Sequence, residues 1–487
     1  MRNLFKAMMT TGGATLVAQV LGLVSNKILA LHLGTAGIGF YSLMRQVHDT
    51  ATSLGSVGAG GLAQGLAGRE GAARLRLLRA AILLSSLGAL VAMVLLFAAP
   101  GAVAELLFDS TDGNGVAAIA ICGATVVLGI AWTTLGAVLG AARAIAALAL
   151  VGIAGALATA LLAWPVALVA GTRPYLLALL IGAPLLLQLA AGAVVLGRSR
   201  FIDAAASGAP ARPGNAEFRY FAGFFGYNIL MGAIATGAIL LVRAGIVHRA
   251  GLDAAGLFAA GWGIGMQSMA VILSAFSLYV VPTLAADTPE QRRRTLQDTA
   301  TLIMSLTLPA LAILLVFKAL VVRILFSDEF LPTVALLQWV LLGNYLKALG
   351  WVLAVPLLAT ADLRRLFPLE AGWYVLFAAG TTLALQRPDW LSGIGIAFVA
   401  AYAVYIAAGG WLTWRRFGFR PSRRFLAVFA AGGLTLGATA VATWNETFTR
   451  WPLAVAVPVA ACLVALLGLT PQQRQKIVLY AVSMGRL

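Results

Sequence analysis

Four of the basic residues within the long apolar segments of this 487-residue chain are candidates for chemistry, because a charged side chain needs an unusual reason to persist there. They are Lys27, Arg45, Arg243 and Lys347. Placing a cation at the centre of a bilayer costs about 2.5–3.5 kcal/mol on insertion scales, so such residues are kept where they face water, a ligand or a countercharge. Phosphate groups pair well with Arg and Lys. An excess of cations inside apolar segments therefore predicts a site for an anionic ligand.

Further polar residues accompany these cations. Asp49 follows Arg45 by one helical turn, so the two side chains could pair and offset each other's burial. They belong to a polar stripe on one helical face, formed by Tyr41, Arg45, His48, Asp49, Thr52 and Ser56. Asn26 adds a neutral hydrogen-bonding group beside Lys27. We expect the substrate-binding residues to be Lys27, Arg45, Arg243, Lys347, Asp49, His48 and Asn26.

Each cation also has a structural interpretation, in which its head group reaches the membrane surface or joins an ion pair. We favour this interpretation for Lys318 and Arg323, which lie close to a helix end, and ligand binding for Lys27 and Arg45. The other two cations fit both interpretations.

The titratable and sulfur-containing residues give a weaker signal. Asp49 or His48 could titrate, although a structural pair with Arg45 explains Asp49 equally well. Cys122 and Cys462 both lie in apolar segments and form no disulfide or metal-binding pattern. We predict no catalytic residue, no metal site and no bound cofactor.

The composition defines the elements that must position these residues. The chain is 61% hydrophobic and 10% charged, with a mean hydropathy of +0.94, whereas a soluble domain carries about 25% charged residues. Apolar segments of about 20 residues suit membrane-spanning helices and not the shorter strands of a barrel. We predict an all-α polytopic membrane protein with about fourteen transmembrane helices, near residues 12–32, 38–64, 79–99, 115–140, 145–168, 175–196, 218–244, 252–281, 297–322, 332–358, 368–386, 391–413, 425–444 and 452–470.

The positive charges indicate orientation. Lys and Arg are concentrated in every second gap between apolar segments, as expected when they are retained on the cytoplasmic side. We expect both termini to be cytoplasmic, with a first helix that is retained and not cleaved as a signal peptide. The net charge of +17 follows from this rule and from contact with anionic lipids, so nucleic acid is not an expected partner.

A long hydrophilic stretch divides the segments into groups. It predicts an N-terminal six-helix bundle over 1–197, a cytoplasmic linker over 198–216, a second six-helix bundle over 217–413, and two additional helices with a cytoplasmic tail over 414–487.

An internal repeat supports this division. The chain reads Gly34-Thr-Ala-Gly-Ile-Gly39-Phe-Tyr after the first apolar segment and Gly251-Leu-Asp-Ala-Ala-Gly256-Leu-Phe after the seventh, 217 residues later. Duplication with an even number of helices would relate the two bundles by a pseudo-twofold axis along the membrane normal and enclose a central cavity. The alternative is that Gly and aromatic residues simply concentrate at helix ends.

These motifs carry a family resemblance. The segments Leu33–Leu43, Gly251–Phe258 and Ile324–Ala335 resemble the Wzx-type polysaccharide flippases of the multidrug/oligosaccharidyl-lipid/polysaccharide exporter superfamily. The resemblance implies that the chain moves an undecaprenyl-pyrophosphate-linked oligosaccharide from the cytoplasmic to the periplasmic leaflet by alternating access, for O-antigen, lipopolysaccharide, exopolysaccharide or a related surface glycan.

The same resemblance implies a place and partners. It places the protein in the bacterial cytoplasmic (inner) membrane, among membrane lipids, with a polysaccharide polymerase and a chain-length regulator as candidate partners. It also leaves open coupling to a proton gradient, a sodium gradient or the membrane potential.

Three alternatives to this function differ in what they require. A lipid II flippase of the MurJ type shares the additional helix pair. A multidrug antiporter would expel cations and should present unpaired intramembrane acids, whereas Lys and Arg predominate here. A membrane enzyme would need a substantial external loop for its catalytic residues, and every external gap is short.

Overall fold

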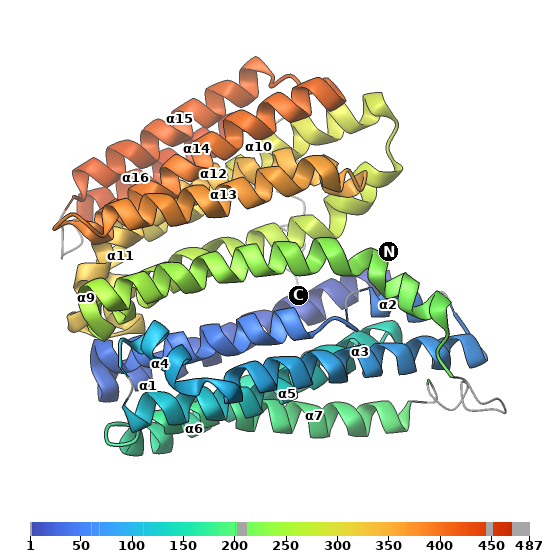
Figure 1. Ribbon diagram of the computed structural model, residues 1–487. Coiled ribbons are helices and arrows are strands. Elements are labelled where there is room, and N and C mark those ends of the chain that lie inside the picture. Colours follow the sequence, from blue (N-terminus) through green and yellow to red (C-terminus); the bar gives the residue numbers. More distant parts are fainter. Residues whose placement is uncertain are drawn as a thin grey trace. The chain divides into compact units, whose positions relative to one another are not determined.

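The computed structural model describes residues 2–59, 61–67, 69–110, 112–199, 201, 212–444 and 451–469 (Figure 1). Within these ranges the chain forms helices and no strands, which confirms the all-α prediction. The helices are α1 Arg2–Gly55, α2 Leu62–Ala67, α3 Gly71–Ala98, α4 Pro100–Phe108, α5 Gly113–Ala141, α6 Ile145–Ala170, η1 Pro174–Ala178, α7 Leu179–Arg198, α9 Asn215–Ala286, α10 Pro289–Val316, α11 Lys318–Leu325, η2 Asp328–Thr333, α12 Val334–Ala359, α13 Leu363–Ala384, α14 Trp390–Phe417, α15 Arg423–Ala442 and α16 Trp451–Gly468.

Eleven of the described helical segments are long and apolar enough to cross a membrane. Two of them, in α1 and α9, each contain a backbone break at a glycine, Gly34 with φ 63° and Gly251 with φ 82°. Glycine adopts such positive φ values without the steric penalty of a Cβ atom. Each break separates two predicted spans. Helix α13 corresponds to one further predicted span, that over 368–386. The described helices therefore account for all fourteen predicted segments.

The structure corrects three predicted boundaries. The span expected over 38–64 ends at Gly55, and α2 follows as a separate short helix. The gap expected after the third span contains α4, which begins at Pro100, a residue suited to the first turn of a helix. The span expected over 297–322 divides at Phe317 into α10 and α11. Short helices thus follow the third and the ninth span alike.

The chain divides into two compact units, which we call unit 1 and unit 2. Unit 1 comprises Met1–Ala259 with Leu325–Ser327, and unit 2 comprises Ala260–Ile324 with Asp328–Leu487. The bundle boundaries expected from the sequence remain predictions. Most of the expected linker over 198–216 and the tail beyond residue 469 lie outside the described residues.

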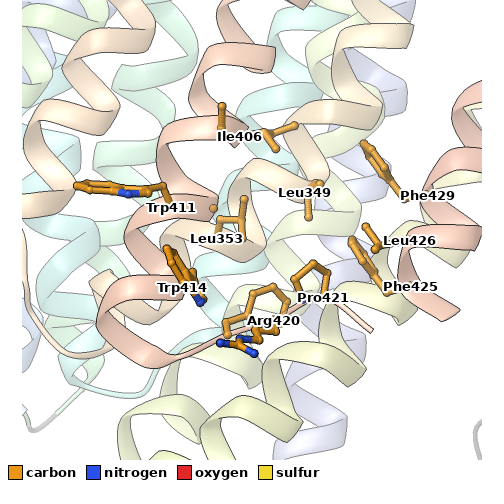
Figure 2. Close-up of a pocket in the computed structure, with 13 residues that line it drawn as sticks. Leu349, Leu353, Ile406, Trp411, Trp414, Arg420, Pro421, Phe425, Leu426 and Phe429 are labelled. Atoms are coloured by element: carbon orange, nitrogen blue, oxygen red, sulfur yellow. The ribbon is translucent and has the colours of Figure 1, made fainter. Parts of the chain in front are cut away.

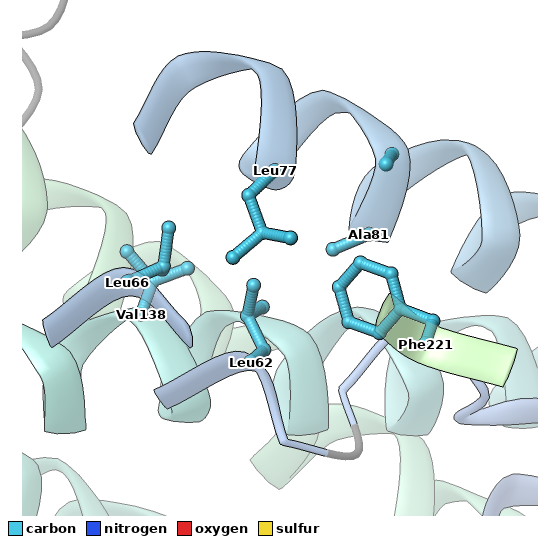
Figure 3. Close-up of a cluster of buried hydrophobic side chains, with 7 residues drawn as sticks. Leu62, Leu66, Leu77, Ala81, Val138 and Phe221 are labelled. Carbon is cyan, nitrogen blue, oxygen red and sulfur yellow. The ribbon is translucent and has the colours of Figure 1, made fainter. Parts of the chain in front are cut away.

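Unit 1 is organised around α1 and α5. Helix α1 packs against α3, α5 and α6, and α5 also contacts α3 and α7. Beside the short helix α2, an apolar core joins Leu62 and Leu66 to Leu77 of α3, Val138 of α5 and Phe221 of α9 (Figure 3). These side chains are at most 3% exposed.

Unit 2 is organised around α12, which packs against α10, α13, α14 and α15. Helices α15 and α16 also pack against α10, so the two additional helices are part of this unit. Large apolar side chains on their outer faces are strongly exposed, including Leu434 and Trp451 at 74% each. Such exposure is expected when lipid is the solvent. The protein is a multi-pass membrane protein.

Candidate functional site

The two copies of the glycine motif meet where α1 crosses α9 in unit 1. A Cβ atom on Gly39 would collide with the carbonyl oxygen of Leu252, and one on Gly256 would collide with the carbonyl oxygen of Thr35. The backbones therefore approach as closely as small residues allow. The repeat predicted from the sequence thus has a local physical basis: its first glycine breaks the helix, and its second permits the crossing.

Polar contacts surround this crossing. The Thr35 hydroxyl donates a hydrogen bond to the Asp253 carboxylate. Lys27, half-buried on α1 before the break, donates through Nζ to the carbonyl oxygen of Phe326. Arg243, which precedes the second copy of the motif as Lys27 precedes the first, donates through one terminal guanidinium nitrogen to the carbonyl oxygen of Ser42 at 3.2 Å. The two cations both bind backbone oxygen atoms.

Arg45 lies further along α1 and differs from these two cations. Its guanidinium group is 3.8 Å from the carboxylate of Asp49, and the two side chains are 62% and 60% exposed. Arg45 also lies close to the buried Tyr41, one helical turn earlier on α1. An exposed ion pair well inside a spanning segment must face water or a ligand, because lipid solvates neither charge.

The structure brings Arg243 into the same electrostatic environment. Its charge interacts with those of Asp49 and Arg45. The guanidinium group also lies 5.7 Å from the centre of the Phe258 ring, and its Nε is buried without a hydrogen-bond partner among the described residues. Arg45, Asp49 and Arg243 therefore form one group in unit 1, with two positive charges and one negative charge.

Two other predicted residues lie elsewhere on α1. His48 is 5% exposed, and its ring nitrogen atoms lie 3.1 Å from the Thr125 hydroxyl of α5 and 3.4 Å from the Thr52 hydroxyl. It packs between α1 and α5, unlike the exposed pair beside it. Asn26 is half-buried next to Lys27.

Lys347 belongs to unit 2. Its Nζ lies 3.3 Å from the sulfur atom of Met266, and its charge interacts with that of Glu370 on α13. Glu370 accepts a 2.6 Å hydrogen bond from the hydroxyl of Tyr405. Glu370 was not among the candidates chosen from the sequence, although it falls inside the span predicted over 368–386.

One turn before Lys347, Asn344 is fully buried. It donates a 2.6 Å hydrogen bond to the carbonyl oxygen of Gly265, while its own Oδ1 has no partner among the described residues.

The two cations for which a structural role was favoured, Lys318 and Arg323, have different partners. Lys318 is 1% exposed and donates to Gln338 Oε1 at 3.1 Å and to the carbonyl and hydroxyl oxygen atoms of Thr443 at 2.7 and 2.9 Å. Its role is structural, as favoured from the sequence, but it reaches internal acceptors on α12 and at the end of α15 and not the membrane surface. Arg323 forms a 2.7 Å ion pair with Asp328.

Aromatic residues form a core in unit 2 and not an exposed platform. Trp262 is 8% exposed and stacks on Phe377 with ring centres 5.1 Å apart. Phe398 packs edge-on against both rings. Trp262 therefore stabilises the bundle.

An apolar cavity of about 380 Å³ lies in unit 2 between α12, α14 and α15 (Figure 2). Leu349, Leu353, Ile406, Trp411, Phe425 and Phe429 contribute to its lining. Arg420 lies at its rim, on the connection between α14 and α15. The lining suits a hydrocarbon chain and not a sugar.

Comparisons with known proteins agree with the motifs. No family model matches the chain. The chain is 26% identical over 427 residues to the lipid III flippases of Escherichia coli (strain K12) and Shigella flexneri, covering 85% of this chain and 99% of each relative. This similarity supports membership of the multidrug/oligosaccharidyl-lipid/polysaccharide superfamily.

Solved structures share the fold. The lipid II flippase MurJ in an inward closed conformation superposes with a TM-score of 0.70 at 13% identity, over 95% of this chain and 98% of that one. An inward-facing multidrug resistance MATE family transporter gives 0.66 at 14% identity, over 81% and 94%. At these identities the likeness shows a common fold.

Proposed function

We propose that this protein is a flippase that moves an undecaprenyl-pyrophosphate-linked oligosaccharide across the bacterial inner membrane by alternating access. The observation that carries the proposal is the exposed Arg45, paired with Asp49 inside a spanning segment and joined electrostatically by Arg243. Sequence similarity to lipid III flippases over nearly their whole length supports the lipid-linked class of substrate.

The physical task explains the cations. A pyrophosphate without partners in hydrocarbon would be prohibitively unstable, as any unpaired ion is. Arg45 and Arg243 would supply charge-assisted hydrogen bonds to the phosphate oxygen atoms, and Lys27 a further donor. The lipid tail can remain in an apolar environment while the head group crosses. The cavity lined by Leu349 and Phe429 has the chemistry to hold a hydrocarbon chain.

The direction of transport follows from the proposed orientation. Arginines concentrated in alternate gaps favour cytoplasmic termini and a cytoplasmic linker. The substrate then enters from the cytoplasmic leaflet and leaves to the periplasmic leaflet. We propose O-antigen, exopolysaccharide or a related surface glycan as the product, with a polymerase and a chain-length regulator as partners.

The test is export in a bacterial strain that lacks its own flippase for the glycan. We expect Arg45→Ala to reduce surface glycan at least about tenfold at equal protein abundance, because a hydrogen bond to a charged group contributes about 1.5–3 kcal/mol. Arg45→Lys should retain part of the activity. The matched control is Arg323→Ala, which removes an arginine in a structural ion pair. Equal export by Arg45→Ala and the wild type would remove Arg45 from the site.

A lipid II flippase is the second candidate. It is favoured by the likeness to MurJ over 95% of the chain. Complementation separates the two candidates. Rescue of a strain depleted of its lipid II flippase would support this alternative, whereas rescue of surface glycan export alone would support the first proposal.

A further inference from the structure

Unit 2 contains a carboxylate, Glu370, and a cation, Lys347. The contacts proposed between unit 1 and the substrate head group use neither of them. Glu370 is half-buried on α13 and accepts the 2.6 Å hydrogen bond from Tyr405 of α14. Its charge interacts with that of Lys347 on α12. A carboxylate inside a membrane is costly unless it has a specific role or partner.

The hydrogen-bonding capacity of Lys347 and of the neighbouring Asn344 is only partly used. The acceptor closest to Lys347 Nζ among the described side chains is the sulfur atom of Met266, and a thioether is a weak acceptor. Asn344 Oδ1, one turn away on the same helix, is buried without a donor among the described residues. Lys347 can therefore exchange its weak acceptor for a stronger one, such as a phosphate oxygen.

Charge balance determines what must follow. Without ligand, Lys347 and Glu370 together carry no net charge. A pyrophosphate bound to Lys347 would add at least two negative charges beside the Glu370 carboxylate. Like charges close together in a poorly solvated site disfavour the ionised form of a carboxyl group.

We propose that Glu370 takes up one proton when an anionic head group binds at Lys347, so that substrate binding is coupled to protons. The inference rests on the proposed function, since it assumes an anionic lipid substrate. The proton comes from the aqueous phase and forms an O–H bond on Glu370 Oε2. Oε1 continues to accept from Tyr405, and the new hydroxyl can donate to an oxygen atom of the bound phosphate.

The surroundings leave Glu370 as the group that responds. Tyr402 and Tyr405 face it from α14, and Tyr374 lies on its own helix α13. Tyrosine hydroxyls ordinarily stay protonated near neutral pH. Lys347, facing it from α12, is the charged partner among the described residues and is already protonated when it binds an anion.

The test measures proton uptake during binding by the full-length protein in detergent. The ligand is undecaprenyl pyrophosphate, and undecaprenol serves as the uncharged control ligand. Calorimetric titration in two buffers with different ionisation enthalpies gives the number of protons bound per ligand. We expect the wild type to take up close to one proton more than Glu370→Gln does. Its affinity should rise by up to about tenfold per pH unit of acidification relative to that variant.

Comparison of the two proteins with the same ligand removes the titration of the pyrophosphate itself. Glu370→Gln should still bind, because the neutral amide resembles the protonated acid. Tyr405→Phe is the second variant, in case Glu370→Gln does not fold. It keeps the ring and removes a hydrogen bond that favours the carboxylate, so its proton uptake should extend to higher pH.

The outcomes separate the two proposals. Equal proton counts in the wild type and Glu370→Gln, with binding intact, would overturn the coupling role and leave the flippase proposal standing. Absence of binding by the wild type would overturn the flippase proposal. Unchanged affinity in Lys347→Met would overturn the coupling role, because the anion would then bind away from Glu370.

Discussion

Arg45 in unit 1 and Lys318 in unit 2 are both cations within predicted apolar segments, but the structure surrounds them differently. Arg45 is 62% exposed beside an equally exposed Asp49. Lys318 is 1% exposed and donates to three neutral oxygen atoms from α12 and the end of α15. Lys318 thus caps the C-terminus of α15, where the helix dipole favours a positive charge. Satisfied internal partners mark a structural cation, and exposure inside a span marks a candidate binding residue.

Lys318→Met tests the structural side of this comparison and should have the largest effect. The substitution leaves Gln338 and two oxygen atoms of Thr443 buried without their donor. We expect a loss of about 2–4 kcal/mol in the free energy of unfolding, measured as a lower melting temperature in detergent and as lower abundance. Glycan export per folded molecule should remain close to that of the wild type.

Arg45→Met is the matched control for this variant, with the opposite pattern. Its melting temperature should stay near that of the wild type, while export falls. The comparison fails if Lys318→Met folds normally and abolishes export, since Lys318 would then act on the substrate.

The second prediction concerns the crossing that holds the Arg45 helix in place. Gly39→Ala and Gly256→Ala should each lower stability by about 1–3 kcal/mol, as overpacking does, because the added Cβ atom meets backbone and not a movable side chain. Gly22→Ala on the same helix α1 is the control, since its added Cβ has no atom within 4 Å among the described residues outside its own helical turn. Thermal unfolding of the three variants in one detergent measures the difference.

An equal response of Gly39→Ala and Gly22→Ala would show that the two motif copies do not pack as described. Gly256→Ala could instead lose export and keep its stability. That result would mean that the crossing of α1 and α9 is needed for transport and not for folding.

Much of the fold was predictable because membrane insertion imposes local rules. A span needs about 20 apolar residues, and this requirement is readable in any window of the sequence. The kinks at Gly34 and Gly251 were also signalled, since the two glycines occupy matching positions in the repeat. The break at Phe317 was not readable in this way, because both sides of it are apolar and helical.

The candidate site was less predictable because partners are remote in sequence. Thr443 lies 125 residues from Lys318, and no local pattern connects them. The approach of Arg243 to Arg45 depends on the crossing of α1 and α9 in the same way. Glu370 could have been found from the sequence alone, by treating every carboxylate within a predicted span as a candidate regardless of its distance from the span's end.

An ion pair outside the predicted spans gives the smallest of the predicted effects. Arg76 on α3 lies 3.1 Å from Glu217 near the start of α9. The Glu217 carboxylate accepts a hydrogen bond from the Gly214 backbone N–H, which is the larger cause of its lowered pKa. The hydrogen bond from Arg76 lowers the pKa further. At a pH above the unfolded-state pKa of about 4.3, a lowered folded-state pKa means that the ionised carboxylate stabilises the fold. This stability is lost as the pH falls through the folded-state pKa. Glu217→Gln should therefore cost about 1 kcal/mol or less at pH 7, and the difference from the wild type should shrink on acidification below about pH 4. Melting temperatures of both proteins at pH 7 and pH 3.5 would measure it. A difference that persists at pH 3.5 would mean that shape, and not charge, makes Glu217 stabilising.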